Sequence, residues 1–150
     1  MKKIFIFLSS FLLFLIPSFF IRDFSFFDQL NLPFFALPKP LYGIVWTILY
    51  FLISISISII YHMYQFKYIP DYNKALISNY IFNELFTYVL FYFKQLFFSF
   101  IIALGNFITS LFLYYETKSL DKKAANFLLP YVFFNLFVVV LSLTIYFMNL

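Results

Sequence analysis

The sequence predicts an all-α integral membrane protein, built as a bundle of five transmembrane helices in one domain over residues 1–150. Three observations favour this class. The chain is 65% hydrophobic and only 11% charged, whereas an ordinary soluble domain carries about 25% charged residues. Its mean hydropathy is high, at +0.96. Its apolar runs are also long enough to cross a bilayer as helices, which takes about 20 residues.

Five apolar runs are the predicted spans. A β-barrel would instead show stretches of about ten residues with alternating polarity, and these runs are longer and apolar on all sides. The first run follows two lysines, as in a signal peptide, but no small-residue cleavage site follows it, so we expect a retained helix. The spans cover residues 4–21, 41–63, 75–93, 96–115 and 124–148.

The gaps between the runs predict how the helices are joined. The longest gap, residues 22–40, contains three prolines and predicts an ordered loop. Residues 64–74 and 116–123 carry charged side chains and predict two further loops. Residues 94–95 alone separate the third and fourth runs, which predicts a tight reversal between neighbouring helices.

The basic residues predict the orientation of the helices, because Lys and Arg in short loops favour the cytoplasmic side. The formal net charge is +4, but the basic residues are scattered rather than gathered in a patch, which argues against nucleic-acid binding. We expect a cytoplasmic N-terminus and an external C-terminus. The predicted cytoplasmic side holds Lys2, Lys3, Lys67, Lys74, Lys118, Lys122 and Lys123, and the other side holds Arg22, Lys39 and Lys94.

Several polar side chains fall well inside the predicted spans, where they need partners. Asn79 and Asn83 are four residues apart and share one helix face. Asn106 and Asn135 lie within the fourth and fifth spans. One interpretation is hydrogen bonding between helices. The other is a functional site, above all for Glu84, since a carboxylate at that depth either takes up a proton or lines a wet cavity.

Two pairs of small residues permit close helix packing. They are Ser54 with Ser58 and Ser99 with Ala103, each pair four residues apart. The partner helix belongs either to the same chain or to a second subunit, and the sequence supports both interpretations.

Three motifs occur in a characteristic order. Residues 41–50 have the sequence Leu-Tyr-Gly-Ile-Val-Trp-Thr-Ile-Leu-Tyr and follow the proline-containing loop. Asn83-x-x-Phe86 lies in the third span, and residues 129–134, Leu-Pro-Tyr-Val-Phe-Phe, lie in the last. In this order and spacing the chain resembles the TspO/MBR family, the tryptophan-rich sensory or translocator proteins, from about residue 28 to residue 149.

The resemblance implies a compact five-helix bundle, often a homodimer, with a pocket beneath the 22–40 loop. Members bind tetrapyrroles such as protoporphyrin IX and heme, sterol-like molecules and drug-like apolar ligands. We therefore expect a receptor- or transporter-like protein of a bacterial cytoplasmic membrane, active in stress or porphyrin regulation, without an obligatory cofactor or metal. The implied pocket residues are Phe35 and Pro38 in the loop, Trp46 and Tyr50 in the second span, Asn83 and Phe86 in the third, and Phe134 and Val138 in the last.

The chain departs from the family pattern at its tryptophans. Trp46 is the single Trp, and Phe35, Phe86 and Phe134 stand where members usually carry others. Some members are proposed to degrade porphyrin in light using two such tryptophans, and Phe is a poorer electron donor, so we expect a binding protein rather than an enzyme. The alternatives are a light-dependent porphyrin-degrading enzyme and an accessory membrane bundle without a ligand. Lys39 is a candidate partner for a ligand propionate.

Overall fold

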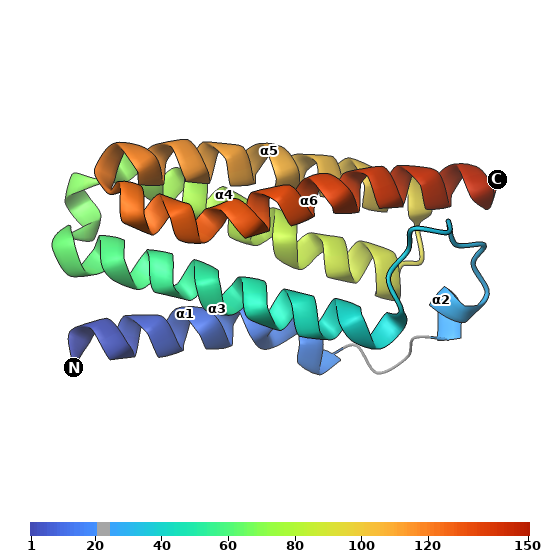
Figure 1. Cartoon of the computed structure of the whole chain (residues 1–150), viewed down its shortest axis with the longest axis horizontal. Helices are drawn as coiled ribbons and strands as arrows, with labels where there is room; N and C mark the ends of the chain where they lie inside the picture. The colour runs from blue at the N-terminus through green and yellow to red at the C-terminus, as the bar shows by residue number, and fades with distance from the viewer. Residues whose placement is uncertain (21–24) are drawn as a thin grey trace.

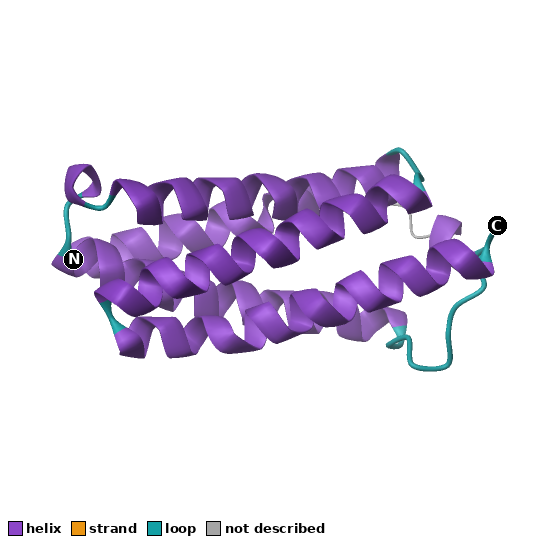
Figure 2. Ribbon diagram, turned by 90° about the horizontal axis from the view of Figure 1, so that it is seen from above, coloured by secondary structure: helices purple, strands orange, loops and turns teal. Residues whose placement is uncertain are grey.

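The computed structural model describes residues 1–20 and 25–150, and all the regular elements in that part of the chain are helical. Figures 1 and 2 show the long helices lying side by side with the connections gathered at the two ends of the bundle. Residues 21–24, which include the end of the first predicted span and the start of the predicted loop with Arg22, lie outside the described residues. The elements are α1 (Lys2–Phe20), α2 (Ser25–Asp28), α3 (Lys39–Met63), η1 (Phe66–Tyr68), α4 (Pro70–Thr87), η2 (Tyr88–Tyr92), α5 (Leu96–Leu120) and α6 (Lys122–Met148).

The long helices pack as a ring. Helix α3 packs against α1 and α6, α6 against α5, and α5 against α4, while α4 makes a smaller contact with α1. Helices α1, α3, α5 and α6 are each long and apolar enough to cross a membrane. Helix α4, continued by the π-helix η2, is the fifth long helix. It is more polar in composition than the other four, and its three asparagines, Asn73, Asn79 and Asn83, are buried inside the bundle. The predicted all-helical membrane bundle is confirmed.

Prolines and one aspartate define where three helices begin. Helix α3 has Pro40 in its first turn, and α4 begins at Pro70, positions where the missing N–H of proline costs nothing. Asp121 is the only residue between α5 and α6. Its side chain accepts a hydrogen bond from the Ala124 N–H at 2.6 Å and so caps α6.

The charged gaps contain more helix than the sequence predicts. Residues 64–74 include η1 and the first turn of α4, and residues 116–123 are helical on both sides of Asp121. Lys and Glu are good helix formers, so a charge ends an apolar run without ending the helix. Between η2 and α5 the chain does reverse tightly, and Lys94 there takes a φ of 54°, in the left-handed region.

A group of polar side chains, all buried except the half-buried Thr109, connects four helices and is called the central polar cluster. The side-chain oxygen of Asn106 accepts hydrogen bonds from Asn79 Nδ2 at 3.0 Å and from the Tyr131 hydroxyl at 3.1 Å. Asn83 Nδ2 donates to the Tyr50 hydroxyl at 3.0 Å, which extends the cluster to α3. These asparagines thus form hydrogen bonds between helices. The members are Tyr50, Asn79, Asn83, Asn106, Thr109, Tyr131 and Asn135.

The two pairs of small residues pack helices within the chain. Ser54, Ser58, Ser99 and Ala103 are all buried inside the single subunit. They allow the helices of one bundle to approach closely, so neither pair offers a surface to a second subunit.

Candidate functional site

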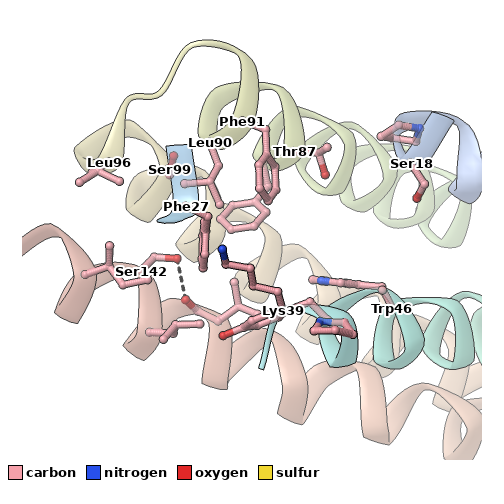
Figure 3. A pocket seen from close by; sticks show the side chains of 18 of the residues that line it. Ser18, Phe27, Lys39, Trp46, Thr87, Leu90, Phe91, Leu96, Ser99 and Ser142 are labelled. Carbon is pink, nitrogen blue, oxygen red and sulfur yellow. Dashed lines mark hydrogen bonds between the residues drawn. The ribbon is translucent and has the colours of Figure 1, made fainter. Parts of the chain in front are cut away.

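A cavity of about 430 Å³ lies at the end of the bundle where the C-terminus is found, at the right of Figure 1. Its walls come from the ends of α1, α4 and α6 and from the starts of α3 and α5, and α2 and η2 also contribute. The lining is mainly aromatic and aliphatic, with a few hydroxyls, as Figure 3 shows. A volume of this size falls in the range of small-molecule sites.

Four of the residues implied by the family resemblance line this cavity. Trp46 and Tyr50 contribute from α3, Phe86 from α4 and Val138 from α6. The Trp46 and Tyr50 rings are 5.5 Å apart and tilted by 31° to one another. Because Trp46 and Tyr50 are one helical turn apart, their rings form a continuous aromatic strip along one face of α3.

Two more of the implied residues lie directly behind that strip. The Phe134 ring meets the Trp46 ring edge to face at 5.2 Å. Asn83 is buried, and its amide donates to the Tyr50 hydroxyl. Neither side chain lines the cavity, but each contacts one that does, so both fix the position of the aromatic strip.

The two implied residues of the loop lie outside the wall. The Phe35 ring packs 6.3 Å from the Phe137 ring and contacts the apolar cluster that contains Phe27 and Leu90. Pro38 is exposed and immediately precedes α3. Within residues 22–40 the described residues that line the cavity are instead Phe27 of α2 and, in the first turn of α3, Lys39 and Pro40.

Hydrogen bonds tie the segment between α2 and α3 to the bundle. The Asn31 N–H donates to Asn149 Oδ1 at 2.8 Å, and Asn149 Nδ2 donates back to the Asn31 carbonyl at 3.0 Å. The Leu37 N–H donates to the Tyr42 hydroxyl at 3.0 Å. The segment is therefore attached both to the end of α6 and to the start of α3, beside the cavity.

The polar groups of the wall are few. Lys39 is the one charged side chain among the described lining residues, and it forms an ion pair with Asp28 of α2. The Ser99 and Ser142 hydroxyls donate to carbonyl oxygens of their own helices, at 2.6 Å and 2.7 Å. The cavity thus offers an apolar surface with one cation at its edge.

Several lining residues were not identified from the sequence, although helical spacing could have found most of them. Leu90 follows Phe86 by one turn, and Leu141 and Ile145 follow Val138 by three and seven residues. Each shares a helix face with its motif residue. The lining residue of α2 has no such signal, because it reaches the cavity only through the folding of the loop.

Glu84 is not among the lining residues. It is half-buried on α4, and one of its carboxylate oxygens has no hydrogen-bond partner among the described residues. The expectation that this carboxylate lines a wet cavity is therefore not met by the cavity described above.

The fold and the cavity define a helical membrane protein with an apolar small-molecule cavity at one end of its bundle. The sequence model of the TspO/MBR family matches residues 5–148, and the chain belongs to that family. It is 37% identical over 127 residues to the "Tryptophan-rich protein TspO" of Bacillus cereus, an alignment covering 85% of this chain and 82% of the relative. It is also 37% identical over 108 residues to the "Uncharacterized membrane protein YtaB" of Bacillus subtilis, covering 72% and 70%.

Proposed function

We propose that this membrane protein is a receptor- or transporter-like binder of flat apolar ligands, with tetrapyrroles such as protoporphyrin IX and heme as the leading class. The observation that carries the proposal is the cavity of about 430 Å³ walled by Trp46, Tyr50, Phe86 and Val138 in a TspO/MBR family chain. Aromatic rings offset-stack on planar π systems, and a mostly apolar wall with few polar groups suits such a ligand.

The residues around the cavity would act in two ways. Trp46, Tyr50, Phe86 and Val138 would contact the ligand. Asn83 and Phe134 would hold the aromatic strip in place, while Phe35 and Pro38 would help to position the covering loop. A sterol-like or drug-like apolar molecule would use the same surface, and no obligatory cofactor is part of this proposal.

A titration of protoporphyrin IX into the purified protein in detergent tests the proposal. We expect quenching of the fluorescence of Trp46, the single indole. Val138 is buried and lines the cavity, so a Val138→Phe substitution would fill the space the ligand needs. We expect it to weaken binding at least about tenfold, because overpacked sites accommodate extra volume poorly.

The matched control is Val140→Phe on the same helix. Val140 is 49% exposed on the outer face, so the same change in size should leave binding unaltered. Equal affinities of the two variants, with both shown to be folded by circular dichroism, would contradict the proposed site.

Illumination of the complex distinguishes a binder from the enzyme alternative. Unchanged porphyrin absorbance is expected for a binder, and light-dependent loss of it would favour the enzyme alternative.

We also propose that the protein lies in a bacterial cytoplasmic membrane with its N-terminus in the cytoplasm. The two chain termini lie at opposite ends of the bundle (Figure 1), and the lysine distribution favours this orientation. A reporter that is active only outside the cytoplasm should be active when fused after Leu150. If a reporter that works only in the cytoplasm is instead active when fused there, the proposed orientation is wrong. A homodimer remains a proposal from the family, to be tested by the mass of the detergent-solubilised protein.

A further inference from the structure

The cavity has an unusual edge, formed by a cation that is already paired. Lys39 opens α3 and lines the cavity, and its ammonium group forms an ion pair with the carboxylate of Asp28 on α2. Figure 3 shows Lys39 among the side chains that line the cavity. The neighbouring residue on α2, Phe27, lines the same cavity, so the pair joins α2 to the first turn of α3 at the cavity edge.

A ligand carboxylate can replace Asp28 in this ion pair at little cost in free energy. The side chains of Lys39 and Asp28 are 37% and 63% exposed, and ion pairs that water can reach contribute little net stability. Asp28 would regain full hydration when it leaves Lys39. A second carboxylate delivered by a ligand could therefore take its position on the ammonium group.

No other side chain among the described lining residues is charged, and the remaining polar groups, such as the Ser18, Thr87 and Tyr42 hydroxyls, are neutral donors that hold a carboxylate less strongly. The Ser99 and Ser142 hydroxyls are engaged with their own helices, and most of the remaining surface is apolar. A carboxylate buried there without a partner would be strongly disfavoured. The start of α3 carries the positive end of the helix dipole, which adds to the charge of Lys39.

We propose that the cavity selects apolar ligands that carry a carboxylate, and that this carboxylate replaces Asp28 on Lys39. The inference rests on the proposed function, because it needs a ligand in the cavity. It adds the chemical group that the ligand must bear and the residue that recognises it. It also links binding to the release of α2, since Asp28 gives up its partner when the ligand arrives.

Protoporphyrin IX and its dimethyl ester separate these points, because they share the macrocycle and differ in the free carboxylates. We expect the wild-type protein to bind the acid about fivefold to tenfold more tightly than the ester, measured by quenching of Trp46. Lys39→Met should remove this preference, and Lys39→Arg should keep it. Asp28→Asn should tighten binding of the acid a few-fold and leave the ester unchanged, because it removes the competing carboxylate.

Lys94 provides the control cation. Its ammonium lies 5.6 Å from the centre of the Phe26 ring, near α2, but it does not line the cavity. Lys94→Met should therefore keep the preference for the acid, and a loss there would point to surface charge in general and overturn the role of Lys39. The two porphyrins partition differently into detergent, but this difference is the same for every variant, so comparing the acid-to-ester affinity ratio between variants removes it.

The possible failures are distinguishable. If wild type binds the acid and the ester equally, or if Lys39→Met keeps the preference, carboxylate recognition by Lys39 is wrong while the cavity proposal stands. If neither porphyrin quenches Trp46 in wild type, the proposed function itself fails, and this inference fails with it.

Discussion

An Asn106→Leu variant is expected to lose about 2 kcal/mol of unfolding free energy relative to wild type. The Asn106 side chain accepts from Asn79 at 3.0 Å and from Tyr131 at 3.1 Å. It donates to Asn135 at 3.1 Å and to Asn83 at 3.5 Å. Hydrogen bonds between membrane helices average about 0.6 kcal/mol each, and Asn106 makes several at the centre of the bundle.

The loss should be cooperative because the members of the central polar cluster share partners. Tyr131 retains the Asn79 oxygen at 3.0 Å after the substitution, but Asn135 loses the donor that reaches its side-chain oxygen. A buried acceptor left in this state costs about 1–3 kcal/mol. Unfolding in mixed detergent micelles, followed by far-UV circular dichroism, measures the change.

Thr109→Val is the matched control for the loss of one contact. Thr109 belongs to the same cluster and accepts from Asn79 at 3.2 Å, yet Asn79 keeps its other acceptors, so we expect a loss of about 0.6 kcal/mol or less. The double variant Asn106→Leu with Asn135→Leu should be less destabilised than the two single losses combined, because removing both partners leaves no orphaned group. An Asn106→Leu protein as stable as wild type would show that the cluster contributes nothing.

The membrane bundle was predictable because its main signal is local. A run of apolar residues of bilayer length indicates a span whatever its neighbours are, and the prolines at 38 and 40 lie where the predicted loop ends and α3 begins. The helix ends were less predictable. Lys122 and Lys123 precede the last apolar run in the sequence and belong to a predicted loop, yet they lie within α6, because charge affects where a helix meets water rather than whether it is helical.

The cavity wall was only partly predictable, and the reason is geometric. Trp46 and Tyr50 belong to one motif, and residues one turn away from a motif residue share its face. Phe27 lines the cavity only because α2 folds back onto the bundle, where Asp28 pairs with Lys39. Such a contact between distant segments has no periodicity in the sequence, so no pattern of residues along one helix could have revealed it.

Asparagines in the spans illustrate a different limit. The sequence shows that Asn79 and Asn83 share a face, and that they need partners within the membrane. It does not show that Tyr131 from α6 and Asn106 from α5 meet them there. Only the packing of the ring of helices brings these groups within hydrogen-bonding distance, and this packing is what joins polar residues from four helices into the central polar cluster.

A Gly105→Ala variant is expected to be destabilised by about 1–3 kcal/mol, the usual cost of inserting a methyl group into a filled space. In a free helix the same change would stabilise, since Ala is a better helix former than Gly by about 1 kcal/mol. The expected change in stability has the opposite sign here because α4 and α5 meet at Gly105. A Cβ on Gly105 would lie 2.3 Å from Cε1 and 2.6 Å from Cδ1 of the Phe82 ring, so the ring or the helices must move.

Gly43→Ala is the control that isolates this contact. Gly43 lies in the first turns of α3, and no atom lies within 4 Å of the Cβ it would gain, so only helix propensity should act there. We expect Gly43→Ala to be neutral or slightly stabilising, while the Gly105 variant unfolds at lower denaturant. Phe82→Ala in the Gly105→Ala background should remove the clash, so the second substitution should cost less there than in wild type. Equal costs in the two backgrounds would show that Phe82 is not what makes glycine necessary at position 105.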